Sequence, residues 1–150
     1  MSAKSDYAVR AAIELAGAEP GTPVKGEAIA EAQKIPMPFL ENILAELRQH
    51  GLVHSKRGAE GGYWLAMPPE RITIADVMRA VDGPLATVRG ESADELTYQG
   101  DAVALKDVWL ALRANVRAVL EGVTLAQVAA GELPSSVSEL LAEPGPEIPG

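Results

Sequence analysis

The stretch that decides the fold is GEAIAEAQKIPMPFLENILAELRQHGLVHSKRGAEGGYWL, residues 26–65. Residues 26–33 predict a short helix, which residues 34–38 (KIPMP) interrupt because proline cannot continue a helix interior. A second helix is predicted from about Pro38 to His50. It carries an apolar stripe at positions i, i+3, i+4 and i+7, formed by Leu40, Ile43, Leu44 and Leu47. Two β-prone runs around a glycine-bearing tip follow within residues 52–66, which predicts a β-hairpin.

The segments on either side of this stretch complete a recognisable order of elements. Residues 3–17 predict a helix that ends at a glycine, and residues 18–24 are rich in Pro and Gly, as is typical of a loop. After the hairpin, Thr73 to Asp76 have the spacing of a capping box and open a helix that ends at Gly83. Helix, short helix, tight turn, amphipathic helix and hairpin is the order of a winged helix-turn-helix. The predicted fold class is therefore mostly α with a small β-hairpin wing, and residues 1–83 are the predicted DNA-binding domain.

The C-terminal half predicts a loop over residues 84–101, because residues 86–101 show no convincing period, and then a long helix from about residue 102. This helix has a heptad-like apolar seam, formed by Leu105, Trp109, Leu112, Val116, Val119 and Val123. Such a seam is more often intramolecular core, but the preceding loop leaves little chain to cover it. Residues 102–123 are therefore predicted to form a dimer interface, in a region over residues 102–131 that ends with a short helix opened by Thr124. Residues 132–150 are predicted to be a largely disordered tail.

Composition excludes several classes of site. The chain has 150 residues, 47% of them apolar, and no cysteine, so disulfides and thiolate metal sites are impossible. No segment has the length and apolarity of a membrane span, and no signal peptide is recognisable, so we expect a cytoplasmic location and no membrane partner. The net charge of −8 is uneven: residues 1–79 hold 9 Lys and Arg against 10 Asp and Glu, whereas residues 80–150 hold 4 against 11.

The outward face of the helix 38–50 offers candidate groups for reading bases. If the apolar stripe faces the core, Glu41, Asn42 and Arg48 face solvent, and the first two lie near the helix start. An Asn side chain can bond adenine bidentately, and a Glu can accept from the cytosine amino group. Candidate backbone contacts come from the wing and the first helix: Ser55, Lys56, Arg57, Gly58, Lys4, Ser5 and Tyr7. Taken alone, such a face is usually just a solvated helix surface.

A larger set of residues together resembles one family, over about residues 1–130. The matching strings are Tyr7-Ala8-Val9-Arg10, Ile29-Ala30, Pro38-Phe39-Leu40-Glu41, Leu47-Arg48, Gly51-Leu52-Val53, Ser55-Lys56-Arg57-Gly58, Gly61-Gly62-Tyr63, Ile72-Thr73-Ile74-Ala75-Asp76-Val77, Val81-Asp82-Gly83, Trp109 and Val123-Thr124-Leu125. They resemble the Rrf2 family of bacterial winged-helix regulators. The family includes the iron–sulfur cluster regulator, the nitric-oxide-sensitive repressor and the cysteine-metabolism repressor. The resemblance implies a homodimer on a palindromic operator, with Pro38, Glu41 and Asn42 at the bases and Arg57 in the minor groove.

The chain departs from the cluster-bearing members of that family. They place three cysteines in the loop before the long helix and a further ligand on it, where this chain has Gly90, Leu96 or Thr97, Val103 and Lys106. Iron–sulfur clusters are held by cysteine thiolates, so we expect no iron–sulfur cofactor and no metal site. The loop 86–101 is then a structural remnant, the wall of an effector pocket lined by Leu96, Tyr98, Leu105 and Trp109, or a protein-docking surface.

The function predicted from these features is that of a DNA-binding transcriptional regulator, a repressor that acts as a homodimer. The alternative is a protein-interaction module that docks a partner on the winged helix and long helix. Lys56 and Arg57 beside an outward Asn42 favour DNA, because a docking module has no need of that combination. An enzyme is disfavoured, since the chain has no nucleophile elbow, zinc-protease or phosphate-loop motif.

Overall fold

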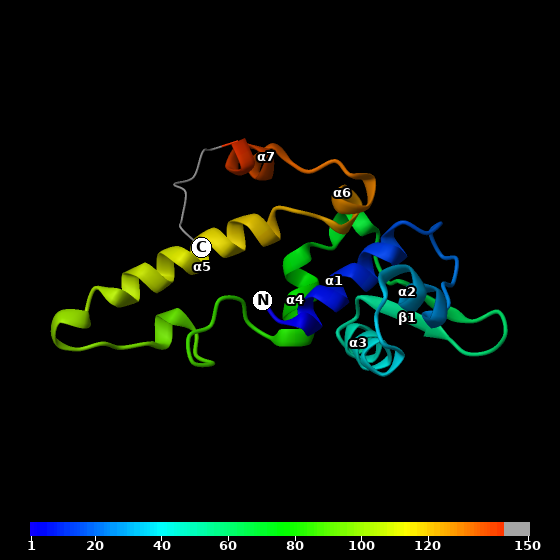
Figure 1. Cartoon of the computed structure of the whole chain (residues 1–150), viewed down its shortest axis with the longest axis horizontal. Coiled ribbons are helices and arrows are strands. Elements are labelled where there is room, and N and C mark those ends of the chain that lie inside the picture. The colour runs from blue at the N-terminus through cyan, green and yellow to red at the C-terminus, as the bar shows by residue number, and fades with distance from the viewer. Residues whose placement is uncertain (143–150) are drawn as a thin grey trace.

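The computed structural model describes residues 1–142 and contains the winged helix-turn-helix that the sequence predicts. The first part of the chain, here called the winged-helix unit (residues 1–83), forms α1 to α4 and the two-stranded wing (Figure 1). The bounds are α1 Ala3–Ala16, α2 Gly26–Gln33, α3 Met37–Gln49, β1 Val53–Lys56, β2 Gly62–Leu65 and α4 Ile74–Asp82. A 3-10 turn, Pro69–Arg71, connects the wing to α4.

The core of the winged-helix unit is the apolar stripe of α3 packed against α1. Leu40, Ile43, Leu44 and Leu47 are all at most 1% exposed. On α1 the facing positions are the small residues Ala8, Ala11 and Ala12, also at most 1% exposed. Small side chains on one helix allow the leucines of the other to fill the space between them at normal packing density. The outward face of α3 follows from this burial.

The wing is anchored by glycines that allow close approach of backbone. Val24 pairs with Tyr63 through two hydrogen bonds of 2.8 Å, which adds a short third segment beside β2. A Cβ at Gly62 would lie 2.6 Å from the carbonyl oxygen of Val24, and one at Gly61 would lie 2.0 Å from that of Lys56. No side chain fits at either position. These glycines therefore serve the hairpin geometry.

Backbone hydrogen bonds between two capped helix starts hold α6 (Leu125–Ala130) against the winged-helix unit. Thr73 caps α4 with Asp76, as predicted, and Thr124 caps α6 with Gln127. The first turns of α4 and α6 are joined by backbone hydrogen bonds from Ile74 to the Val123 oxygen (3.0 Å) and from Leu125 to the Ile72 oxygen (2.9 Å). This junction buries Val123 to 6% exposure within the chain. The prediction that Val123 belongs to the dimer seam is therefore wrong.

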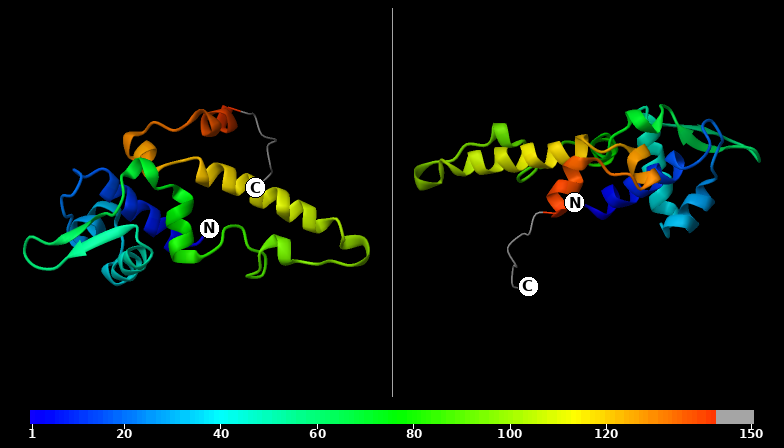
Figure 2. Two further views of the ribbon diagram at one scale, coloured as in Figure 1. Left: turned by 180° about the vertical axis from the view of Figure 1, so that it is seen from behind. Right: turned by 90° about the horizontal axis from the view of Figure 1, so that it is seen from above.

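The second part of the molecule, here called the arm (residues 86–121), extends away from the winged-helix unit (Figures 1 and 2). It consists of α5 (Leu105–Glu121) and the preceding segment, which contains two 3-10 turns, Ala93–Glu95 and Gly100–Ala102. The helix starts at Leu105, slightly later than predicted. The segment before it packs on α5: Leu96 is 1% exposed, and the Trp109 indole donates a hydrogen bond to the Tyr98 hydroxyl at 2.9 Å.

The end of the described chain differs from the sequence prediction. Ser135–Ala142 form a helix, α7, whereas the sequence predicts a largely disordered tail over residues 132–150. Its sequence, SSVSELLA, alternates good helix formers with serines and follows Pro134, which suits the start of a helix. The Pro- and Gly-rich residues 143–150 lie outside the described residues. Within residues 1–142, no helix is both long and apolar enough to cross a membrane.

Candidate nucleic-acid interface

The start of α3 presents a polar face at the end of the molecule that also carries the wing. Pro38, Glu41 and Asn42 are exposed, whereas the stripe beginning at Leu40 is buried. Helix periodicity produces this division, because residues one or two positions from the stripe point away from the core. Pro38 also suits its position in the first helical turn, where its missing N–H leaves no hydrogen bond unmade. An α-helix presented in this way fits the major groove of B-DNA.

The wing tip carries exposed basic groups and contacts the N-cap of α2. Lys56, Arg57 and Gly58 are exposed, and Gly58 has a φ of +105°, a conformation that L side chains rarely adopt. Lys25 donates a hydrogen bond from Nζ to the Gly58 oxygen at 3.0 Å. Sequence reasoning missed Lys25. Its place at the N-cap of α2, the first helix of the helix-turn-helix, is the signal that could have found it, because that helix crosses the DNA backbone.

Arg48 and Ser55 are brought together across the junction of α3 and β1. Arg48 Nη1 donates to Ser55 Oγ at 3.3 Å, and the guanidinium remains exposed. The bond connects the C-terminal end of α3 with the first strand of the wing. Arg48 is thus both a structural link and a cation on the predicted DNA-facing side.

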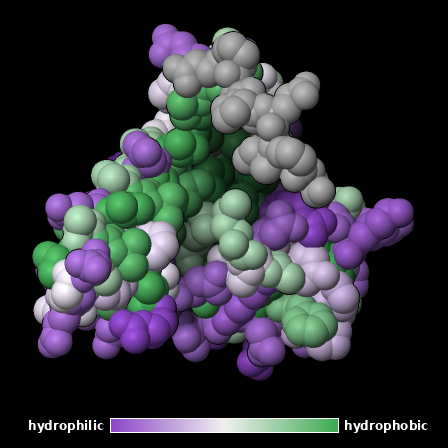
Figure 3. All heavy atoms as spheres, turned by 60° about the vertical axis from the view of Figure 1, so that its left-hand side comes forward, coloured by the Kyte–Doolittle hydropathy of each residue, from purple (hydrophilic) through white to green (hydrophobic). Residues whose placement is uncertain are grey.

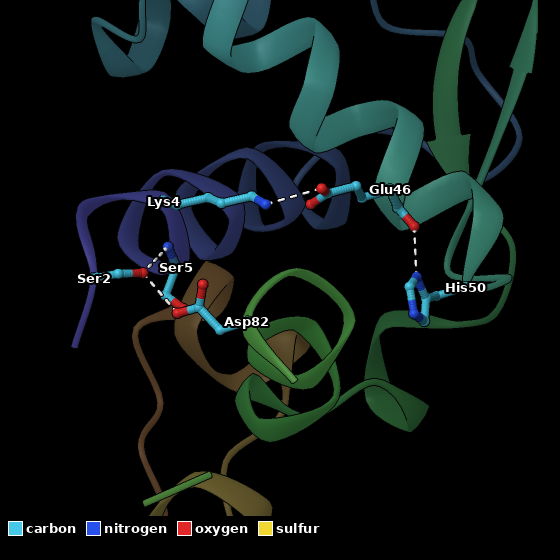
Figure 4. A network of polar contacts seen from close by, with 6 residues as sticks. All are labelled: Ser2, Lys4, Ser5, Glu46, His50 and Asp82. Atoms are coloured by element: carbon cyan, nitrogen blue, oxygen red, sulfur yellow. Dashed lines mark hydrogen bonds and ion pairs between the residues drawn. The ribbon is translucent and has the colours of Figure 1, made fainter. Parts of the chain in front are cut away.

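The start of α1 carries the three residues that the sequence predicts to contact phosphate there, Lys4, Ser5 and Tyr7, and Figure 4 shows the first two. Lys4 forms an ion pair with Glu46 of α3, with 2.8 Å between Nζ and Oε1, and its side chain is 42% exposed. Tyr7 is half-buried. Its ring centroid lies 6.4 Å from that of Phe39 and 5.0 Å from the guanidinium carbon of Arg10. Phe39 itself is 60% exposed at the start of α3, and the sequence alone does not single it out.

Ser5 is not available for DNA, which corrects the prediction. It is 1% exposed, and its hydroxyl donates to the Asp82 carboxylate at the end of α4. The Ser2 hydroxyl donates to the same carboxylate at 2.6 Å and also accepts from the Ser5 backbone N–H, which caps α1. Hydrogen bonds from Ser2 and then Ser5 hold the pKa of Asp82 below its ordinary value. Ser5 therefore joins α1 to α4.

The residues present do not fit a cluster or a metal. The sequence contains no thiolate donor, and within residues 1–142 no three His, Cys, Asp or Glu side chains are grouped to hold a metal ion. Among the candidates for an effector pocket by sequence, Leu96 is buried, and the Trp109 indole donates a hydrogen bond to the Tyr98 hydroxyl.

Comparison with known proteins agrees with this geometry. The family model described as "Rrf2: Iron-dependent Transcriptional regulator" matches residues 1–131. A protein of Mycobacterium tuberculosis named as an HTH-type transcriptional regulator, Rv1287, is 56% identical over 140 residues, which cover 93% of this chain and 87% of that protein. The transcriptional regulator CymR of Bacillus subtilis is 33% identical over 129 residues, covering 86% and 88%.

Solved structures show the same fold. The structure of B. subtilis CymR, titled the global cysteine regulator, aligns with a TM-score of 0.75 over 87% of this chain and 96% of that one, at 33% identity. The structure of T. potens IscR aligns with a TM-score of 0.70 over 97% and 93%, at 32% identity. These relatives are transcriptional regulators rather than enzymes. With a matching family model over residues 1–131 and a winged helix that presents Asn42 and Arg57, the chain belongs to the Rrf2 family of DNA-binding transcriptional regulators.

Proposed function

We propose that this regulator is a repressor that binds a palindromic operator as a homodimer. The observation that carries the proposal is the pairing of two features in one chain. The winged-helix unit presents an outward Asn42 and a basic wing tip, and the arm contains a helix whose apolar seam has no buried residue. Each protomer would read one half-site, and two-fold symmetry of the protein would be mirrored in the DNA.

Support for a dimer comes from the exposure of α5. None of its 17 residues is buried, although Leu105, Trp109, Leu112, Val116 and Val119, here called the seam, are all apolar. Leu112 is 50% exposed and Val108 56%. Figure 3, which looks at the molecule from the side of the arm, shows apolar side chains gathered in a band on this face. Contiguous exposed apolar surface on a soluble protein usually marks an interface.

A cavity beside the seam offers room for the partner's helix. It has a volume of about 780 Å³ and lies between α5, the end of α4 and the N-terminus. Its apolar lining includes Met78, Leu85, Leu112, Val116 and Leu120. Burying such side chains yields about 25 cal/mol per Å² of apolar surface, so a second α5 packed along this cavity would stabilise the assembly.

The proposed roles at the DNA follow from side-chain chemistry. Asn42 would bond an adenine, and Glu41 would accept from a cytosine amino group. Lys25 and Lys56 would contact phosphates, which fix register without reading sequence. Arg57 at the wing tip would enter the adjacent minor groove, whose negative potential attracts guanidinium groups.

We further propose that the protein works without an iron–sulfur cluster or another metal. The support is the chemistry of the donor set: every cluster position implied by the family carries a side chain that cannot supply a thiolate. The purified protein is expected to be colourless. An iron-dependent visible absorption band would contradict this.

Selection of binding sites from a random DNA pool with the purified full chain tests the proposal. We expect an inverted repeat whose half-sites are separated by about one helical turn or a multiple of it. The double variant Lys56→Ala/Arg57→Ala is the control, because it keeps α3 intact and should lose most of the enrichment. No enrichment with the unmodified chain would refute DNA reading and favour the protein-docking alternative.

Transcription from a promoter that carries the selected site tests the sign of regulation. We expect the protein to lower transcription of that template in a purified system, and the Lys56→Ala/Arg57→Ala variant to lower it less. An increase in transcription would show that the protein is an activator.

A further inference from the structure

Three arginines meet where the winged-helix unit joins the arm. Arg79 comes from the last turn of α4, and Arg113 and Arg117 come from α5. Together they line a second cavity of about 260 Å³, here called the arginine cavity, which is completed by Pro84, Leu85, Ser92 and Glu121. A space of this size accommodates a small metabolite or an inorganic anion.

The arginine cavity has more positive than negative charge. Arg79 and Arg117 both contact the Glu121 carboxylate, the latter at 3.2 Å between Nε and Oε1. Arg113 Nη1 lies 2.8 Å from Asp94 Oδ1 and 2.8 Å from Ser92 Oγ. Three guanidinium groups thus share two carboxylates. Because hydrogen bonds from Arg79 and Arg117 lower the pKa of Glu121, that carboxylate is ionised at neutral pH and the excess is one positive charge.

The positive charge of the arginine cavity contrasts with the acidic composition of the C-terminal half of the chain. Residues 80–150 hold only 4 Lys and Arg against 11 Asp and Glu, yet two of those four are Arg113 and Arg117. Arg79 lies just before the region and faces the same cavity. Surface salt bridges contribute little to stability, so packing three guanidinium groups around two carboxylates is a poor structural device. The concentration of donors is better explained by an anionic ligand.

The arginine cavity lies beside the seam rather than on it. Arg113, Arg117 and Glu121 are four residues apart and form one stripe along α5. Leu112, Val116 and Val119 of the seam occupy the neighbouring stripe. A partner helix lying on the seam would therefore leave the arginine stripe to one side. The Arg117 side chain is 51% exposed and that of Arg113 25%.

We propose that the arginine cavity binds a small metabolite oxyanion, a phosphate or carboxylate compound, and that its occupancy changes DNA affinity. Guanidinium groups bond such oxyanions bidentately. The ligand would bind donors from α4 of the winged-helix unit and from α5 of the arm at once, and would so bias the angle between them. The effect on DNA affinity rests on the proposed function. Coupling requires the anion to bind one arrangement of the two parts better than the other.

Calorimetric titration of the full chain, without DNA and at fixed ionic strength, tests the site itself. The probes are inorganic phosphate and, separately, citrate, which distinguish a phosphate from a polycarboxylate ligand. We expect at least one probe to bind, and Arg113→Gln and Arg117→Gln each to weaken it by about tenfold or more, as loss of a charge-assisted donor implies. Arg71→Gln removes one exposed arginine away from the cavity and should leave binding unchanged.

Two results would overturn the site: no binding of either probe to the unmodified chain, or equal binding by both cavity variants and Arg71→Gln. Using two variants guards against one of them failing to fold, which circular dichroism would reveal. Arg117→Gln changes a more exposed side chain and is the milder of the two.

Operator affinity measured with and without the bound probe tests the coupling. At constant ionic strength we expect a change of about fivefold or more in the unmodified chain, in the range of typical allosteric coupling, and none in Arg113→Gln. An unchanged affinity in the unmodified chain would overturn the regulatory part. If the protein bound no DNA at all, the proposed function would fail while the calorimetric result would still decide the anion site.

Discussion

Neighbouring side chains on one helical turn have different roles because their surroundings differ. The Lys4 side chain pairs with Glu46 and remains partly exposed to solvent. Ser5 is buried, and its hydroxyl donates a hydrogen bond to the Asp82 carboxylate. The same contrast exists on α3, where Leu40 is buried and Glu41 and Asn42 are exposed. Residue-scale predictions therefore depend on what each group contacts.

Asn42→Ala is expected to relax one base position of the operator. Loss of a bidentate contact costs about 1–3 kcal/mol for the preferred base and much less for the others. Arg57→Ala should instead weaken binding to all sequences, except where it reads a narrow groove by shape. Fluorescence anisotropy with a panel of single-base operator variants measures both. Gln49→Ala, at the far end of α3, is the control, and an Asn42→Ala profile identical to it would exclude base reading.

Ser5→Ala is expected to lower the free energy of unfolding by about 1 kcal/mol at pH 7, because it removes a buried hydrogen bond to a carboxylate. Folding lowers the pKa of Asp82, so this bond stabilises the protein above the ordinary aspartate pKa. The stabilisation is lost as the pH falls through the lowered folded-state value.

Urea unfolding of both proteins in steps from pH 7 to about pH 2 measures this effect. The difference between the unmodified chain and Ser5→Ala should shrink at the acidic end, while Ser136→Ala on exposed α7 should show no difference at any pH. A difference that is constant with pH would mean that the Ser5 contribution is packing alone.

At the scale of elements, the arm and the wing depend on different physics. The wing is a two-stranded hairpin, which is marginal alone and is held by Val24 and by glycines that admit backbone contacts. The helix α5 is regular but packs little of its surface within the chain. The wing requires glycines so that backbone segments can approach closely, whereas α5 requires a partner to cover its apolar side chains.

Gly61→Ala is expected to destabilise the wing by about 1–3 kcal/mol, the usual cost of forcing extra atoms into a filled site. Its Cβ would meet the Lys56 carbonyl oxygen at 2.0 Å, so the hairpin backbone must move. Thermal unfolding measures the loss, and Gly17→Ala is the matched control because its Cβ would meet only ordinary contacts at 3.7 Å. Equal melting temperatures for the two variants would contradict the close-approach argument.

Leu112→Asp is expected to produce a monomer and to reduce operator affinity. The substitution places a charge in the middle of the seam, where a partner helix would desolvate it without a counter-charge. Analytical ultracentrifugation at micromolar concentration measures assembly. Ala111→Asp adds the same charge one residue earlier, off the seam, and should leave the dimer intact. A dimer that survives Leu112→Asp with unchanged DNA affinity would place the interface elsewhere.

At the scale of the whole molecule, charge is divided between two ends. Residues 1–79 are nearly neutral and carry cations at the wing, whereas residues 80–150, which include the arm, are acidic. The arm itself holds 4 Lys and Arg against 6 Asp and Glu and carries no basic excess, so DNA should approach from the α3 and wing side. The overall charge of −8 is thus compatible with DNA binding.

Operator affinity is expected to fall steeply with salt. The slope of log affinity against log salt is about −0.9 for each phosphate contact, so six or more contacts by a dimer give a loss of about a thousandfold between 50 and 200 mM. Lys25→Ala should make the slope shallower by about 2 for a dimer, one contact from each protomer. Arg71→Gln should not alter it. An affinity independent of salt would contradict phosphate contacts altogether.

Local sequence information was sufficient for most of the elements. Apolar spacing predicted α3 and its outward Glu41 and Asn42, and capping boxes at Thr73 and Thr124 predicted two helix starts. These features depend on neighbours within a few positions along the chain, which is why a sequence pattern reveals them. The absence of cysteine likewise needs no structure to exclude a thiolate-held cluster.

Only the tertiary structure decided which surfaces are covered and which charges meet. Periodicity placed Val123 in the seam, and Ser5 was a candidate phosphate contact, but contacts with α4 bury both. Arg79 is separated from Arg113 and Arg117 by more than thirty positions, so no local pattern could bring them to one cavity. A helical period defines the faces of a helix, whereas the identity of what packs on each face depends on the path of the whole chain.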